Sequence, residues 1–94
     1  MTYNIDENVV ARSVDHYGEE IQATVCMEEC AELIQAISKE KRGKIGRDNM
    51  TEEIADVLIC IEMLKQMYMI SEDKINKWIE KKQAREAERM EKNE

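Results

Sequence analysis

Two short acidic segments carry the first chemistry that this sequence suggests. They read Met27-Glu-Glu-Cys-Ala-Glu32 and Thr51-Glu-Glu-Ile-Ala-Asp56. In each, one acid follows another by three positions: Glu29 and Glu32, then Glu53 and Asp56. Residues three apart share one face of a helix, where like charges are slightly destabilising. Neither segment contains a Lys or Arg to relieve the repulsion, so a bound cation is the expected partner.

The ligand types favour magnesium, a hard cation that takes oxygen ligands octahedrally and retains some water. The single histidine, His16, lies far away in sequence, and a Cys26/Cys30 pair supplies only half of a zinc site. We therefore expect a site for Mg²⁺, with Mn²⁺ as the alternative ion, formed by Glu29, Glu32, Glu53 and Asp56. The competing interpretation is that these acids are solvated helix faces, which a single E-x-x-E usually is.

The elements that position these acids are expected to be helices, because the 94 residues include no proline and three glycines. The pattern predicts one all-α domain over residues 1–94 with four helices. The first spans 6–17, starting from a capping box of Asn4 and Glu7, and the second runs from Glu19 to near Arg42. The third follows a loop at 43–50 and is capped by Asn49 or Thr51, and Ser71 caps the fourth. A short connection predicts that the middle two helices pack antiparallel, which places the acid pairs opposite each other.

Apolar periodicity predicts which faces are buried. In the second helix the stripe is Cys26, Cys30, Leu33 and Ile37, widened by Ile21, Val25 and Ile34, and all three cysteines are expected to be reduced and buried. The third helix is apolar on more than one side and is expected to be central and the most buried. In the fourth, Ile75, Trp78 and Ile79 form the buried face with Trp78 as its anchor, and 80–94 is a solvated helix end.

Bulk properties exclude several function classes. The net charge of −7 disfavours binding to a nucleic acid polymer, since phosphate contacts need a basic surface. The longest apolar run, 57–61, is far shorter than the roughly 20 apolar residues of a membrane span. The first residues lack the basic and apolar segments of a signal peptide, so we expect a cytoplasmic protein.

The acidic segments resemble those of the MazG-like all-α nucleoside triphosphate pyrophosphohydrolases. The resemblance runs from Gly18 through Glu-Glu-Cys-Ala-Glu-Leu33 and Arg42-Gly43 to Glu-Glu-Ile-Ala-Asp-Val57 and Leu64. It implies a four-helix bundle-like MazG-type fold completed by oligomerisation, as a homodimer or homotetramer with sites near a subunit interface. It also implies that the four acids bind magnesium and that the products are a nucleoside monophosphate and pyrophosphate, in the clearance of unwanted nucleotides.

Members of this family have a basic motif on a later helix, and this motif contacts phosphates. The resemblance assigns the motif to Lys77 and Lys81 here. Basic residues around the central loop are the alternative: Lys39, Arg42, Lys44 and Arg47. Gln22 is a candidate contact to the base or ribose. The competing function is a non-catalytic helical interaction or regulatory module, or a protein that binds nucleotide without hydrolysing it. These residues do not indicate which nucleotide is the preferred substrate.

Overall fold

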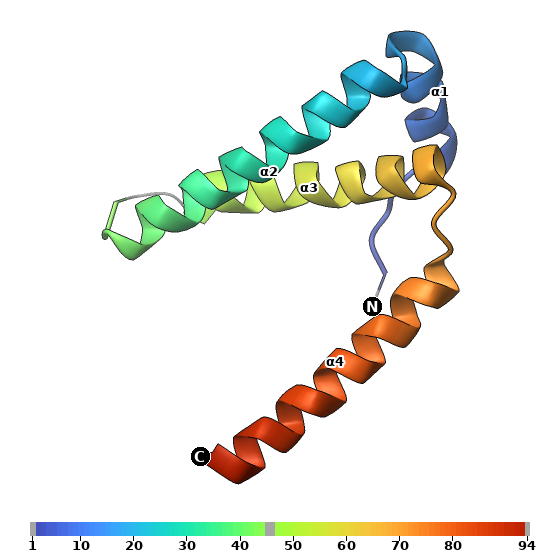
Figure 1. Ribbon diagram of the computed structural model, residues 1–94. Coiled ribbons are helices and arrows are strands. Elements are labelled where there is room, and N and C mark those ends of the chain that lie inside the picture. Colours follow the sequence, from blue (N-terminus) through green and yellow to red (C-terminus); the bar gives the residue numbers. More distant parts are fainter. Residues whose placement is uncertain (1, 45–46, 94) are drawn as a thin grey trace.

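The computed structural model describes residues 2–44 and 47–93, and this part of the chain forms four helices and no strand (Figure 1). They are α1 (Glu7–Tyr17), α2 (Glu19–Lys41), α3 (Arg47–Tyr68) and α4 (Glu72–Asn93). The expected all-α class and the number of helices are confirmed.

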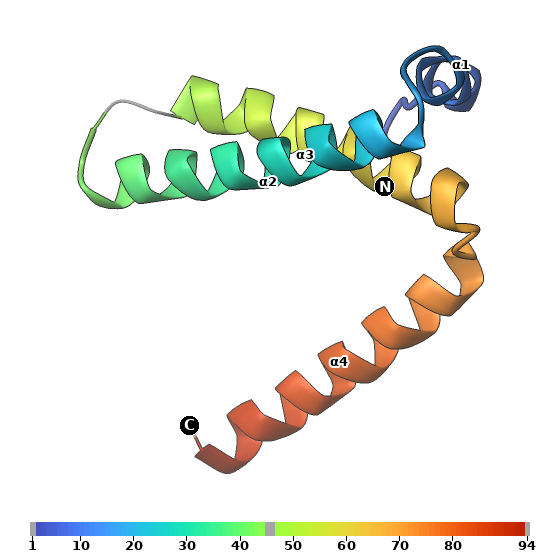
Figure 2. The ribbon, with the colours of Figure 1, turned by 45° about the horizontal axis from the view of Figure 1, so that its top comes forward.

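Helices α2 and α3 lie side by side as an antiparallel hairpin in both views (Figures 1 and 2), as the short connection predicted. Helix α1 packs across the open end of this hairpin and contacts both of its helices. The core lies where the three meet and consists of five buried side chains: Val10, Cys26, Cys60, Met63 and Met67. Helix α3 contributes more buried residues than any other helix, which confirms its central place.

The ends of α2 and α4 follow capping rules. Gly43, at φ 76°, ends α2 in a Schellman motif in which its own N–H donates to Glu40 O and that of Lys44 donates to Lys39 O. Ser71 caps α4 as predicted, because its Oγ accepts a hydrogen bond from Lys74 N at 3.0 Å.

Two predicted N-terminal caps are wrong. The cap of α1 is Asp6, whose Oδ1 accepts from Asn8 N and Val9 N, so Asn4 and Glu7 form no capping box. Helix α3 already begins at Arg47, and Thr51 donates from Oγ1 to Arg47 O within the helix instead of capping it. The part of the predicted loop at 45–46 lies outside the described residues.

The buried faces of the hairpin differ from the predicted apolar stripes. Of the stripe on α2, Cys26 is buried, whereas Cys30, Ile34 and Ile37 are exposed. The inward faces include polar or small residues instead: Gln22 and Ala36 on α2, and Glu53 and Glu62 on α3. Hydrophobic periodicity could not find these faces because it assigns carboxylates and amides to solvent.

Helix α4 packs closely against none of the other helices in the described chain, and it extends away from the hairpin (Figures 1 and 2). Trp78, expected as its buried anchor, is therefore 57% exposed. The accessible surface of the chain is 7906 Å², against about 5,600 Å² for a compact monomer of this mass. One chain thus leaves an unusually large surface uncovered.

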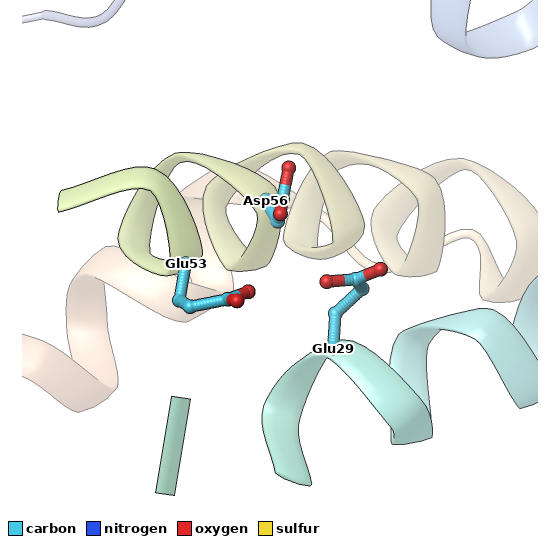
Figure 3. Close-up of side chains that lie close together, drawn as sticks. All are labelled: Glu29, Glu53 and Asp56. Carbon is cyan, nitrogen blue, oxygen red and sulfur yellow. The ribbon is translucent and has the colours of Figure 1, made fainter. Parts of the chain in front are cut away.

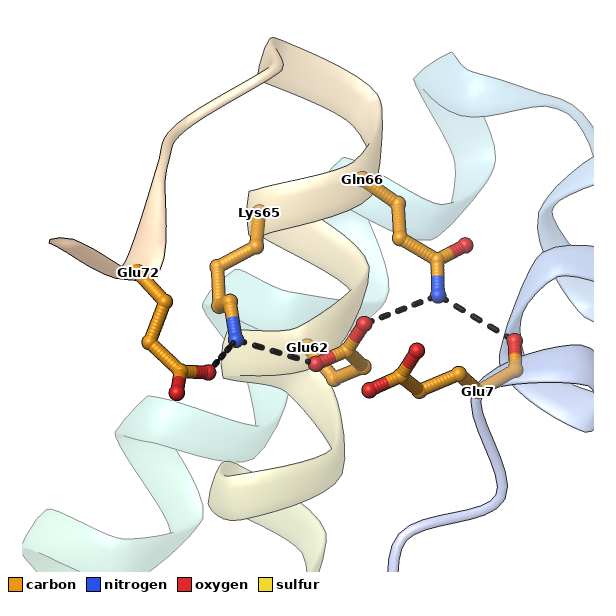
Figure 4. A network of polar contacts seen from close by, with 5 residues as sticks. All are labelled: Glu7, Glu62, Lys65, Gln66 and Glu72. Atoms are coloured by element: carbon orange, nitrogen blue, oxygen red, sulfur yellow. Dashed lines mark hydrogen bonds and ion pairs between the residues drawn. The ribbon is translucent and has the colours of Figure 1, made fainter.

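A polar network fixes the junction between α1, α3 and α4 (Figure 4). Lys65 Nζ lies 3.3 Å from Glu62 Oε1 and 2.8 Å from Glu72 Oε1, so it joins α3 to the first turn of α4. Gln66 Nε2 donates to Glu62 Oε2 and to Glu7 O, which ties the start of α1 to α3. The hydrogen bond to Glu72 raises the pKa of Lys65, and the same contact lowers the pKa of Glu72.

The turn after α3 gives a stability prediction. Met69 has a φ of 54°, a left-handed conformation that costs an L-residue about 1–2 kcal/mol, and its side chain is 91% exposed. Met69→Gly should therefore raise the free energy of unfolding by about 1 kcal/mol, measured in urea. Gly43→Ala should lower it by a similar amount, since a Cβ there meets no atom within 4 Å and only the backbone is strained. A loss of stability in Met69→Gly would contradict this account.

Candidate metal centre

Three carboxylates converge between the two helices of the hairpin (Figure 3). Glu29 comes from α2, and Glu53 and Asp56 come from α3, one helical turn apart. One oxygen from each lies within 4.8 Å of the other two. The antiparallel packing of α2 on α3 therefore brings together three of the four acids singled out in the sequence.

Among the described residues, two buried oxygens of this cluster have no hydrogen-bond partner: Glu29 Oε1 and Glu53 Oε1. An ionised carboxylate oxygen removed from water without a donor is costly. Because both oxygens belong to the same cluster, the cost points to a cation that binds there.

The electrostatics of the cluster are repulsive. Burial, followed by the charges of Glu32 and Asp56, raises the pKa of Glu53 from 4.5 to about 7. The same kinds of effect raise the pKa of Glu29, with burial again the largest cause and Glu32 the next. No Lys or Arg of the described residues contributes to either shift. The protein thus holds carboxylates together without supplying positive charge of its own.

Glu32 lies at the edge of the cluster. It is exposed, and it is outside the group of three whose oxygens approach within 4.8 Å. It is still close enough to perturb the pKa values of Glu29 and Glu53. Its place at the exposed edge suits a ligand that closes around an ion from the solvent side.

Two thiols lie beside the carboxylates. Cys26 precedes Glu29 by three positions and Cys60 follows Asp56 by four, so helical spacing aims both toward the same interior. Cys26 Sγ donates to Cys60 O at 3.6 Å. Burial raises the pKa of Cys60 to about 12 and also raises that of Cys26, so both stay protonated. Both cysteines were predicted to be reduced and buried, and their helical spacing from the acids is the signal in the sequence that places them beside the site. The expectation that Cys30 is also buried is wrong, because it is exposed.

The other predicted site residues lie elsewhere. Gln22 is buried, and its Nε2 donates to Ser13 Oγ at 3.4 Å, between α1 and α2; its contact with substrate stays a prediction. Lys77 and Lys81 are on α4, which does not pack on the hairpin. Lys77 pairs with Asp73 at 3.6 Å, and Lys81 Nζ lies 5.0 Å from the centre of the Trp78 ring.

The donor set fits a hard divalent cation. All of the converging ligand atoms are carboxylate oxygens, which Mg²⁺ and Mn²⁺ accept, and the two buried thiols are protonated and face the interior. The two carboxylate oxygens without a hydrogen-bond partner, Glu29 Oε1 and Glu53 Oε1, are available as ligands to such an ion.

The comparison with known families agrees with this geometry. The sequence model of the MazG nucleotide pyrophosphohydrolase domain matches residues 18–90, which include both helices of the hairpin and most of α4. The chain belongs to the MazG family. The comparisons with curated proteins and with solved structures found no match.

Membership in the MazG family confirms the predicted family and points to nucleotide pyrophosphohydrolase activity in general terms. Within the described ranges, none of the helices has both the length and the apolar composition to cross a membrane.

The raised pKa of Glu53 predicts how stability depends on pH. The fold favours the protonated form of Glu53. Its contribution to the free energy of unfolding is therefore fully present below the unfolded pKa of 4.5 and is lost as pH rises through about 7. The melting temperature of metal-free protein should therefore fall between about pH 5 and pH 8. A divalent cation at this centre would bind the ionised form, so the melting temperature should rise more on adding Mg²⁺ at pH 8 than at pH 6.

Two variants test the assignment to Glu53. Glu53→Gln should flatten the pH dependence of the metal-free melting temperature, because the titrating group is gone. Glu52→Gln, an exposed neighbour, removes one charge and should leave the dependence as it is. The same slope in all three proteins would show that Glu53 does not titrate in this range.

Proposed function

We propose that this MazG protein is a magnesium-dependent nucleoside triphosphate pyrophosphohydrolase that clears unwanted nucleotides from the cytoplasm. It would convert a nucleoside triphosphate and water into a nucleoside monophosphate, pyrophosphate and a proton. The observation that supports this most is the group of three converging carboxylates with two buried oxygens that lack a partner. On the solvated acidic face of an interaction module, the carboxylate oxygens would be exposed to water and not buried without a partner.

Four carboxylate side chains form the proposed metal centre. Glu29, Glu53 and Asp56 hold the cation between α2 and α3, and Glu32 completes the ligand set from the exposed edge. When bound, a divalent cation there neutralises the triphosphate and activates water. The bond that breaks is the anhydride between the α- and β-phosphates, with the oxygen of water added to the α-phosphorus.

The departing pyrophosphate needs further positive charge. We propose that Lys77 and Lys81 supply it, since they are one turn apart on α4 and could grip one phosphate group together. The contact between Lys77 and Asp73 is exposed, and exposed ion pairs contribute little, so this lysine is free to exchange partners.

Within the described part of one chain, α4 packs closely on neither helix of the hairpin, so we propose that α4 of a second chain reaches the carboxylates. The uncovered surface supports this assembly, because about 2,000 Å² beyond that of a compact monomer matches the area lost in a permanent interface. The exposed stripe of Met27, Cys30, Ile34 and Ile37 on α2 is available to pack against the apolar side of α4, which carries Ile75, Trp78 and Ile79. A homodimer or homotetramer would then hold sites built from two chains.

The enzymatic prediction is release of pyrophosphate from at least one nucleotide in a panel of canonical and modified dNTPs, dependent on Mg²⁺. Glu32→Gln and Asp56→Asn should each lower turnover by more than about 100-fold, since each removes a ligand worth several kcal/mol to the transition state. Circular dichroism should show unchanged helicity. Near-normal turnover in either variant would contradict the ligand assignment. A wild-type protein that releases no pyrophosphate, and that Mg²⁺ does not stabilise against heat, would favour the interaction module.

The assembly prediction uses the single tryptophan of the chain. Sedimentation should give two or four times the chain mass of 11.0 kDa, and Trp78 emission should shift to the red on dilution as the chains separate. Ile34→Glu should place a charge in the interface and yield single chains. Val9→Glu, at an exposed site on α1, is the matched control and should assemble normally. A wild-type protein that sediments as one chain at micromolar concentration would refute the shared site.

A further inference from the structure

A groove of about 550 Å³ runs along α2 from the α1–α2 turn toward the candidate metal centre. Its volume is within the usual range for sites that bind small molecules. Seven residues line it: Tyr17, Gly18, Glu20, Ile21, Thr24, Val25 and Glu28. None of them has a role in the chemistry described so far.

The groove lies on the side of α2 next to the carboxylates, about a quarter turn around the helix from Glu29. Ile21, Val25, Glu28 and Glu32 recur at steps of four, three and four, which forms one stripe along a helix. Glu32, at the end of this stripe, perturbs the pKa of Glu53 in the metal centre. At 1.5 Å per residue, Val25 lies about 6 Å along the axis from Glu29, and Ile21 about 12 Å. A nucleotide whose phosphates lie at the carboxylates has its base one sugar away, which is this distance range.

The other large hollow does not fit this requirement. It measures about 580 Å³ and lies where α1, α2 and α3 meet, with Arg12 and Gln66 among its lining residues. Gln66 is ten residues beyond Asp56 on α3, or about 15 Å along the axis. The groove along α2 is nearer, because Val25 and Glu28 in its lining lie within about 6 Å of Glu29 along the axis.

The lining combines apolar contact with hydrogen-bond acceptors. The ring of Tyr17 and the side chains of Ile21 and Val25 are available to contact the faces of a flat ring. When ionised, Glu20 and Glu28 accept hydrogen bonds and have no proton to donate. Thr24 already donates from Oγ1 to Glu20 O at 3.2 Å, so its oxygen is left as an acceptor. The hydroxyl of Tyr17 is the remaining side-chain donor in the lining.

We propose that this groove receives the nucleobase of the substrate and selects bases that carry an exocyclic amine: cytosine, adenine or guanine. The proposal rests on the proposed pyrophosphohydrolase function and gives it a substrate class. An exocyclic amine donates to a carboxylate, as Glu and Asp accept from the amine of cytosine elsewhere. Uracil and thymine present two carbonyl oxygens flanking one N–H, and these oxygens would face Glu20 and Glu28 without a donor.

The groove is also separate from the surface assigned to assembly. At 100° per residue, the stripe through Ile21 and Val25 lies on the opposite side of α2 from Met27, Cys30 and Ile34. A second chain on the assembly stripe would leave the groove open to a nucleotide.

The decisive measurement is the ratio of kcat/KM for dCTP to that for dUTP, followed by pyrophosphate release with Mg²⁺. The wild-type ratio should be about tenfold or more in favour of dCTP, as expected for one hydrogen bond to a charged acceptor. Glu20→Gln replaces an acceptor with an amide that can also donate, and should bring the ratio close to one. Glu19→Gln makes the same change of charge one residue away, outside the groove, and should preserve the ratio.

A second variant tests the location by size. Ile21→Trp fills the groove, and because Ile21 is 56% exposed the substitution leaves the core intact. It should lower kcat/KM for every nucleotide by about tenfold or more, through the loss of apolar contact by the base. Inorganic tripolyphosphate has no base, so its inhibition constant should be the same for Ile21→Trp and the wild type.

Three results would overturn the inference while leaving the proposed function intact: an active enzyme that prefers dUTP, a ratio unchanged in Glu20→Gln, or an inhibition constant for tripolyphosphate that worsens together with kcat/KM in Ile21→Trp. Hydrolysis of no nucleotide at all would overturn the proposed function and this inference with it.

Discussion

The mutual repulsion of acids held between α2 and α3 is the constraint on which the rest of the molecule depends. Burial and like charges together raise the pKa of Glu53 to about 7. Ionisation of Glu53 near neutral pH therefore destabilises the metal-free fold. The hairpin tolerates this because Cys26 and Cys60, one turn from Glu29 and Asp56, belong to an apolar core that continues along α3 through Met63 and Met67. The cation that we propose here would offset the repulsion directly, because its ligands would include the oxygens that have no donor. Stability and ligand binding are therefore set by the same few side chains.

Much of the fold and of the site could be predicted from the residues. Low glycine and absent proline indicated helices, and a short connection indicated antiparallel packing, which places the two acidic segments in register. That logic needs only local geometry, so Glu29, Glu53 and Asp56 were found together as expected. The cap at Ser71 followed for the same reason, because a hydroxyl at that position satisfies a nearby N–H whatever the tertiary structure.

The errors have one physical origin. Periodicity identifies apolar residues, but it does not say whether they are covered by the same chain or by another. Ile34 and Ile37 are as apolar as core residues and are exposed here, while Gln22, Glu53 and Glu62 point inward. Trp78 followed the same pattern, since α4 is amphipathic and yet packs closely on no other helix of the described residues. The orientation of α4 depends on Lys65, which pairs with acids on both α3 and α4. Pairings of this kind are common in any charged sequence and carry no distinguishing signal.

The hairpin also determines the order in which the molecule can form. Its two helices are neighbours in sequence, and such local contacts close quickly because little chain entropy is lost. The acids of the metal centre all belong to this hairpin, so they can come together while α4 is still free. The contacts that we propose between α4 and a second chain would depend on concentration and would form later. At low concentration a cell would thus contain chains that already hold a metal and lack the lysines of a partner, and the abundance of the protein would itself control how much of it is complete.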